Sequence, residues 1–159
     1  MLFQKILIAM MILGSLLTAC SDATKTSTDT IFVNNSGHDI IITPYFQGAI
    51  YINDVLEIKQ AEIETFNKTT RGLVKTGTSY ASWLLAADSI VVNYGNSIKK
   101  VHLSKKIVSN TAMALQFDEV RNILNEKSYI FRIKESSIRK QEVEYEYTFT
   151  KADYEEALK

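Results

Sequence analysis

Gln141–Thr150 reads QEVEYEYTFT, and the alternation in this stretch decides the fold class of the chain. Successive side chains of a β-strand point to opposite faces of the sheet, so a period of two puts one face in a core and the other in water. Here the large apolar residues occupy every second position: Val143, Tyr145, Tyr147 and Phe149. The stretch is therefore predicted to be a strand, with Ser128–Lys134 as its partner.

Other segments have the β-branched and aromatic composition and the length of short strands. They are Asp39–Phe46, Val55–Ile58, Ile63–Phe66, Ser89–Tyr94 and Ile98–Leu103. Gly95-Asn96-Ser97 separates the last two segments and predicts a hairpin. Pro44 indicates an edge strand or a bulge near the end of the first segment. Because helices do not alternate with these strands, we expect an all-β fold, an antiparallel sandwich or open barrel, in a single domain over residues 31–159.

Two short helices are predicted within this domain. Thr150-Lys151-Ala152-Asp153 resembles a capping box, which predicts a C-terminal helix running through Leu158. Apolar residues near helical spacing predict a second helix over Phe117–Asn125.

Residues 1–19 differ in kind from the rest of the chain. Lys5 is followed by Ile6–Leu17, a run of twelve residues without a charge, whereas a membrane-spanning helix needs about 20 apolar residues. A basic start, a short apolar run and small residues after it are typical of a secretory signal peptide. A buried core helix is the alternative, but the segment has no polar face and no helix stop signal.

The only cysteine of the chain follows this segment directly. Leu17-Thr18-Ala19-Cys20 resembles the lipobox of bacterial lipoprotein precursors. The resemblance implies cleavage between Ala19 and Cys20, a thioether from the Cys20 thiol to diacylglycerol, and an acyl chain such as palmitate on the new amino group. Two or more chains are needed because a single one binds a bilayer only marginally. No thiol then remains for an internal disulfide, so an apolar core has to hold the domain.

Residues 20–30 are predicted to be the lipidated cysteine and a flexible tether. Ser21–Thr30 contains six serine or threonine residues and no large apolar side chain. Ser21 after the lipid site resembles the sorting pattern of outer-membrane lipoproteins, and Ile31–Ile40 and Tyr145–Tyr154 look like segments of small Bacteroidetes-type lipoproteins of uncharacterised function. These resemblances imply a place in the cell envelope, at the outer membrane, and leave its periplasmic and surface faces both open.

Two tripeptides resemble the Asp-Ser/Thr-apolar acceptor of O-glycosylation in Bacteroidetes. They are Asp29-Thr30-Ile31 and Asp88-Ser89-Ile90. Thr30 lies in the predicted tether and is expected to be the more accessible acceptor.

Composition and spacing argue against several function classes. Eighteen basic and eighteen acidic residues cancel, whereas nucleic-acid binding needs a concentrated basic face. Two histidines and one cysteine cannot form a cysteine-rich zinc site. Gly72–Ser79 has the glycine spacing of a phosphate loop but lacks its lysine. We therefore expect no nucleic acid, metal or cofactor.

Three groups of residues carry side chains of the kinds used in hydrolysis. Ser36, His38 and Asp39 are adjacent in sequence, so His38 and Asp39 would project to opposite sides of an extended chain. His102 has no located partner and is expected at the surface. The last group could serve glycoside hydrolysis or hold calcium, but an exposed face of glutamates, offset by Arg132 and Lys134, is the favoured interpretation. It consists of Glu142, Glu144 and Glu146.

Because the sequence shows no coherent catalytic set, the first hypothesis for function is a non-enzymatic, lipid-anchored binding module of the cell envelope. Its partner would be a protein or a glycan, with the membrane contacted through the N-terminal lipid. A small envelope hydrolase acting on glycan or peptide is the alternative, and a structural subunit of an envelope complex is a third. A cleft joining His102 to a carboxylate and a hydroxyl would favour the hydrolase, and an exposed aromatic or apolar patch would favour the binding module.

Overall fold

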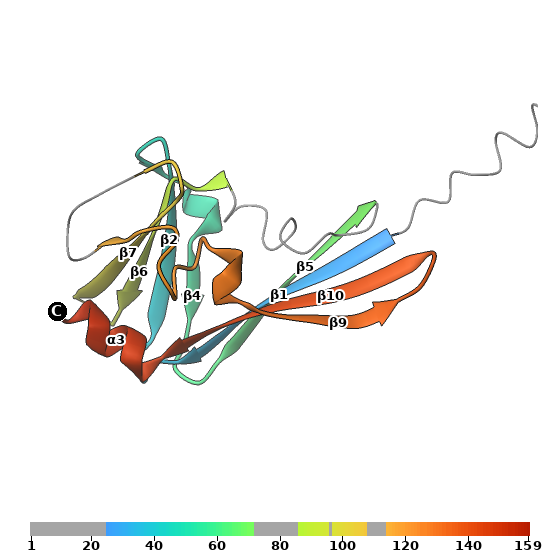
Figure 1. Ribbon diagram of the computed structural model, residues 1–159. Helices are drawn as coiled ribbons and strands as arrows, with labels where there is room; N and C mark the ends of the chain where they lie inside the picture. The colour runs from blue at the N-terminus through green and yellow to red at the C-terminus, as the bar shows by residue number, and fades with distance from the viewer. Residues whose placement is uncertain (1–24, 72–85, 96, 108–113) are drawn as a thin grey trace, which may run out of the picture.

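A computed structural model of the chain describes residues 25–71, 86–95, 97–107 and 114–159, which form two β-sheets and one short α-helix (Figure 1). The first sheet has the order β5 (Ile63–Arg71), β1 (Lys25–Asn35), β10 (Lys140–Thr150) and β9 (Ile130–Ser136). The second has the order β3 (Ala49–Ile50), β2 (Ile40–Phe46), β6 (Ser89–Tyr94), β7 (Ile98–Leu103) and β8 (Ala114–Leu115), with β4 (Leu56–Ile58) also paired to β2. The remaining elements are the 3-10 turns η1 (Ile52–Asp54) and η2 (Glu126–Ser128) and the helix α3 (Lys151–Ala157). The predicted all-β sandwich with a short helix is confirmed.

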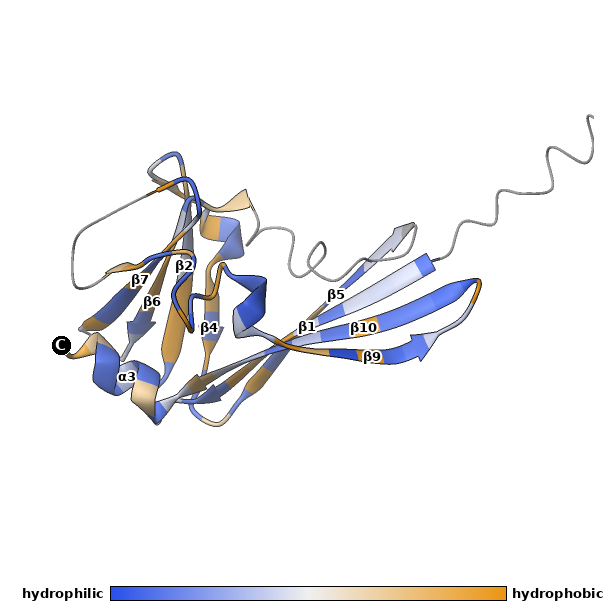
Figure 2. Ribbon diagram, viewed as in Figure 1, coloured by the Kyte–Doolittle hydropathy of each residue, from blue (hydrophilic) through white to orange (hydrophobic). Residues whose placement is uncertain are grey.

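The core lies where the two sheets face each other. On β10 the alternate residues predicted to be buried are all buried: Val143, Tyr145, Tyr147 and Phe149. Phe32 of β1 is fully buried beside them, and its ring meets Tyr129 edge-on with the centroids 6.3 Å apart. Ile40 and Ile42 of β2 contribute from the second sheet. Figure 2 shows this hydrophobic colour gathered on the second sheet and on the part of β10 and β1 nearest to it.

The first strand differs from the prediction in two ways. Lys25–Thr30 belongs to β1 and does not form a flexible tether, because Thr26, Thr28 and Thr30 alternate with outward-facing residues and are buried. Threonine is β-branched and favours strands, but its low hydrophobicity hides the period of two. In addition, β1 pairs with β10 in parallel, and β7 pairs with β8 in parallel, so the sheets are not wholly antiparallel as expected.

The strands of the second sheet follow the prediction closely. β6 and β7 form the predicted hairpin, with Gly95 at φ 61° in the turn. β2 is paired along most of its length with β6, but Pro44 directs its carbonyl to the N–H of Tyr51 at 3.3 Å. The N–H and C=O of one residue in an antiparallel strand point the same way, so the missing N–H of Pro44 faces the gap between β3 and β4. Pro44 thus occupies an edge-like position within an inner strand.

The predicted helix over Phe117–Asn125 is wrong, because this segment is a series of turns that ends in η2. Arg121 has a φ of 74°, which an α-helix does not contain. The buried Asn122 side chain donates to the carbonyls of Leu103, Leu115 and Gln116 at 2.8–3.1 Å. Hydrogen bonds from asparagine side chains to backbone groups compete with the backbone hydrogen bonds of a helix, and in this segment the side-chain bonds form instead of the helix.

The C-terminal helix is confirmed together with its capping box. The Thr150 hydroxyl accepts the N–H of Asp153, and the Asp153 carboxylate accepts the N–H of Thr150 at 2.7 Å. Within the described part of the chain, the structure contains no helix of the length and apolarity that a membrane crossing requires. Ala19 and Cys20 lie outside the described residues, as does Gly72–Ser79.

Candidate functional site

The glutamates of β10 form a network of ion pairs on the outer face of the first sheet. Arg132 of β9 reaches Glu144 and Glu146 at 2.7 Å each, and Lys134 reaches Glu144 at 2.5 Å. The hydrogen bond from Lys134, with that from Arg132, outweighs desolvation and lowers the pKa of the Glu144 carboxyl. A general acid needs a raised pKa. The predicted charge compensation by Arg132 and Lys134 is confirmed, but Glu144 is only 7% exposed and does not belong to an exposed face as expected. Its lowered pKa does not suit a general acid.

Ser36, His38 and Asp39 do not form a triad. The Ser36 hydroxyl donates to the side-chain oxygen of Asn34 at 2.7 Å, whereas the His38 ring stacks on Tyr154 with the centroids 4.0 Å apart. Asp39 accepts the N–H of Gln60 at 2.9 Å, which lowers the pKa of the Asp39 carboxyl. The three side chains therefore have separate partners: Ser36 within its own turn, His38 on α3 and Asp39 in the turn between β4 and β5.

His102 is buried, which contradicts the surface position expected for it. Its Nδ1 accepts the N–H of Ile123 at 3.1 Å, and Nε2 has no hydrogen-bond partner among the described residues. Burial lowers the pKa of His102 to about 3, with nearby Lys100 and Arg121 acting in the same direction and Asp153 opposing them. The imidazole is therefore neutral at ordinary pH.

The space beside His102 is too small for a substrate. A cavity of about 10 Å³ is lined by Tyr94, Lys100, His102, Leu115, Asp153 and Glu156. This volume is close to that of one water-sized probe. Lys100 and Glu156 pair across its rim at 3.1 Å, and Asp153 is bound by Arg121. The polar residues around His102 thus attach α3 to the sheets and do not form an open catalytic cleft.

A larger, open depression lies at the other end of the second sheet, and we call it the β3–η1 cleft. It has a volume of about 750 Å³ and is lined by Phe46, Gln47, Ala49, Tyr51, Asp54, Ala86, Asp88 and Lys106. The rings of Phe46 and Tyr51 meet edge-on with the centroids 4.8 Å apart. Three consecutive residues at its border are exposed: Ile50, Tyr51 and Ile52, at 51%, 56% and 76%. This is the exposed aromatic and apolar patch that favours the binding module.

A tight turn gives the β3–η1 cleft its form. Gln47 and Gly48 both have positive φ, 51° and 79°, and connect β2 to β3 by the two-residue hairpin that suits twisted strands. The left-handed conformation is unfavourable for glutamine. The Asp88 carboxylate accepts the Gln47 N–H, and the Asp88 N–H donates to the Tyr45 carbonyl at 2.8 Å, so Asp88 holds the turn from the neighbouring strand end.

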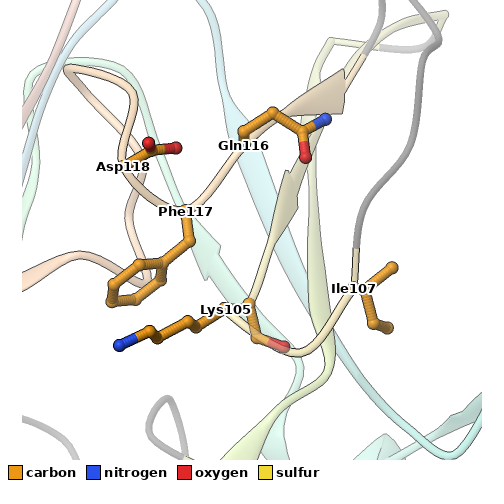
Figure 3. A pocket seen from close by; sticks show the side chains of 6 residues that line it. Lys105, Ile107, Gln116, Phe117 and Asp118 are labelled. Carbon is orange, nitrogen blue, oxygen red and sulfur yellow. The ribbon is translucent and has the colours of Figure 1, made fainter.

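A second, smaller pocket adjoins the turn Ser104–Ile107, which is closed by a bond from the Ile107 N–H to the Ser104 carbonyl at 3.0 Å. The pocket has a volume of about 250 Å³ and is lined by Ser104, Lys105, Ile107, Gln116, Phe117 and Asp118. Figure 3 shows the Lys105 side chain extending below the ring of Phe117, with Gln116 and Asp118 above. Lys105 lines this pocket and Lys106 lines the β3–η1 cleft, so the turn Ser104–Ile107 borders both depressions.

The two predicted glycosylation acceptors differ in accessibility. Thr30 is 1% exposed in the middle of β1, so the expectation that it is the more accessible acceptor is wrong. Ser89 is half-buried at the start of β6, where it pairs with Leu103 and Tyr45. The described residues contain no group of three or more histidine, cysteine or acidic side chains that could hold a metal ion.

Sequence reasoning missed the β3–η1 cleft. Its residues come from β2, the turn before β3, η1 and the segments next to β6 and β7, so no single stretch contains the pattern. The Gln47-Gly48 turn and the apolar Ile50-Tyr51-Ile52 are the signals that sequence does offer. Comparisons of the chain with protein-family models, with curated proteins and with solved structures found no match.

Proposed function

We propose that this chain is a lipid-anchored protein of the cell envelope, at the outer membrane, and that its β-domain is a non-enzymatic binding module. The observation that carries the binding role is the β3–η1 cleft, which is open, about 750 Å³ in volume and bordered by the exposed ring of Tyr51. The observation that supports the anchor is the lipobox-like Leu17–Cys20 after an uncharged run.

The chemistry of the β3–η1 cleft favours a glycan as its ligand. An exposed aromatic face packs against the apolar side of a sugar ring, while carboxylates and amides bond to its hydroxyls. Tyr51 supplies such a face, and Asp54, Gln47 and Lys106 supply polar groups around it. A protein partner would instead cover the apolar border residues Ile50 and Ile52, so crosslinking in native membranes separates the two classes.

Lipidation is tested in the producing cell. Cultures given an alkyne-bearing fatty acid should incorporate it into the wild-type protein, and the Cys20→Ser variant should incorporate none and keep its signal segment. Mass spectrometry of the N-terminal peptide should show acylated Cys20 as the first residue. A wild-type protein that retains Met1 and carries no lipid would contradict the anchor.

Binding is tested with the lipidated full chain in detergent, applied to an array of envelope polysaccharides and peptidoglycan fragments. Tyr51→Ala should weaken binding by about tenfold, since one aromatic stacking contact is worth up to about 1.5 kcal/mol. Ile130→Ala is the matched control, because Ile130 is a similarly exposed apolar residue, at 52%, on β9. Equal binding by wild type and Tyr51→Ala would show that the β3–η1 cleft is not the site.

A further inference from the structure

The end of the first sheet where β1 begins carries a surface that the proposed function leaves unused. Figure 1 shows the start of β1 and the β9–β10 turn at one end of the molecule, and α3 with the C-terminus at the other. Lys25 is in register with Lys140 of β10 and with Arg71 of β5. The Lys25 N–H also donates to the Arg139 carbonyl at 3.0 Å. We call Lys25, Ile138, Arg139 and Lys140 the sheet tip.

The turn at the sheet tip has an unusual residue at its apex. Ser137 donates its N–H to the Lys140 carbonyl at 2.7 Å, so Ile138 and Arg139 are the two central residues of the turn. Turn apices favour glycine, asparagine, aspartate and serine, which are small or polar. Ile138 is instead a large apolar residue, and it is 91% exposed. Figure 2 shows hydrophobic colour at this turn, next to hydrophilic colour on the adjoining ends of β9 and β10.

Basic residues surround Ile138. Lys25 and Arg139 are exposed, and within the described part of the chain neither takes part in an ion pair. Lys140 is paired with Glu135 and Glu142 at 2.8 and 2.6 Å. Among the described side chains of the sheet tip and its ion pairs, the cations of Lys25, Arg139 and Lys140 stand against the carboxylates of Glu135 and Glu142. An exposed aliphatic side chain flanked by cations suits the boundary between anionic headgroups and acyl chains.

The length of chain before β1 identifies the occupant of this surface. Five peptide steps separate Cys20 from Lys25, and a fully extended chain covers at most about 3.6 Å per step, or about 18 Å in all. If Cys20 is anchored in the bilayer, as the proposed function holds, the start of β1 cannot lie farther from the membrane than that. The anchor would therefore keep the sheet tip within reach of the lipid surface.

We propose that the sheet tip is a second, reversible membrane contact, in which Ile138 enters the headgroup region of an anionic bilayer and Lys25 and Arg139 pair with lipid phosphates. This inference rests on the proposed lipid anchor and adds an orientation to it. The first sheet stands on the membrane by its end, and the opposite end of the molecule, with α3, points away.

Spin labels at two positions test the contact. The Cys20 thiol is consumed by lipidation, so Ile138→Cys and Val120→Cys each supply one free thiol for a nitroxide. Val120 is the matched control, because it is also a highly exposed apolar turn residue, at 84%, next to Arg121, which contacts Thr148 near the far end of β10. Nine residues of β10, from Lys140 to Thr148, lie between the two sites, a length of about 26 Å at about 3.3 Å per residue.

The lipidated full chains are purified in detergent and reconstituted into vesicles of phosphatidylethanolamine with a minority of phosphatidylglycerol. We expect the label at 138 to be several-fold less accessible than the label at 120 to a water-soluble nickel chelate, and more accessible to oxygen, which concentrates in the bilayer. Replacing phosphatidylglycerol by phosphatidylcholine, or adding Lys25→Gln with Arg139→Gln, should remove most of this difference.

Failure of the contact and failure of the anchor give different results. If the chain floats with the vesicles but the labels at 138 and 120 are equally accessible to nickel, the membrane contact is wrong and the anchor stands. If the chain without added cysteines takes up the nitroxide at Cys20, or does not float with the vesicles, the anchor is wrong and the orientation inferred from it is wrong as well.

Discussion

At the scale of single residues, His102 is a buried base that the fold keeps neutral. Its Nδ1 accepts a backbone N–H, so the hydrogen-bond geometry assigns the proton to Nε2. Burial disfavours the protonated imidazole most, Lys100 and Arg121 add to this effect, and Asp153 opposes it. The folded state therefore discriminates against the protonated imidazole.

This discrimination predicts how acid affects stability. The pKa of His102 is about 3 in the folded state, against about 6.5 in an unfolded chain. Between pH 6.5 and pH 3 the unfolded state binds a proton at His102 and the folded state does not. The free energy of unfolding therefore falls as the pH falls below about 6.5. Urea unfolding should show a loss on the order of 1–2 kcal/mol between pH 6.5 and pH 5.

His102→Asn is the test variant, because asparagine offers an acceptor to the Ile123 N–H and does not titrate in this range. Its unfolding free energy should change less between pH 6.5 and pH 5 than that of wild type. His38→Asn is the control, since His38 lies half-buried against Tyr154 and outside this cluster. An unchanged pH slope in His102→Asn would contradict the burial described for the imidazole.

At the scale of elements, α3 is a seven-residue helix and cannot be stable alone. Arg121 attaches it, because the guanidinium binds the Asp153 carboxylate and lies 4.7 Å from the centre of the Tyr147 ring. Burial raises the pKa of Asp153, but hydrogen bonds from Arg121 and Thr150 outweigh this effect and lower the pKa overall.

Removing the charge of Asp153 should therefore loosen α3. Asp153→Asn leaves the half-buried Arg121 without its counter-charge, so we expect the free energy of unfolding in urea to fall by about 2 kcal/mol. Relative to wild type, amide hydrogen exchange should accelerate more in α3 than in β10. Glu155→Gln is the control in the same helix, because the Lys151–Glu155 pair at 3.6 Å is exposed and should contribute little. Equal stability of the two variants would show that the Arg121–Asp153 pair does not hold the helix.

The same elements show what sequence can predict and why. β10 follows from a period-two pattern of large apolar residues, and α3 follows from its capping box. β2 and the β6–β7 hairpin follow from β-branched and aromatic composition, with Gly95-Asn96-Ser97 as the turn signal. β1 was missed over Lys25–Thr30 because its buried residues are threonines, which composition assigns to a tether. An alternation of period two is the same for parallel and antiparallel strands, so the parallel pairing of β1 with β10 could not be predicted from it. The β3–η1 cleft could not be foreseen because Asp88 and Lys106 reach Tyr51 only through the tertiary fold.

At the scale of the whole molecule, β1 is an inner strand of the first sheet, paired with β5 on one side and β10 on the other. A polypeptide that starts at Lys25 keeps all of β1, whereas one that starts at Ile31 loses six of its eleven residues, including three buried threonines. We expect the first to unfold cooperatively in urea and the second to be unfolded or aggregated, because the edges of β5 and β10 are then exposed. Cooperative unfolding of the shorter polypeptide would contradict the place of Lys25–Thr30 in the sheet.

The parallel pairing of β1 with β10 also determines when the first sheet can form during synthesis of the chain. The Thr26 hydroxyl donates a hydrogen bond to the side chain of Gln141, 115 residues away. The first strand to be synthesised therefore cannot pair with β10 until the last strand has been synthesised. Contacts of such long separation form slowly, since the intervening loop must close first. A nascent chain whose β10 is still inside the ribosome cannot complete its first sheet. We therefore expect the first sheet to form only after the C-terminal strand has been synthesised.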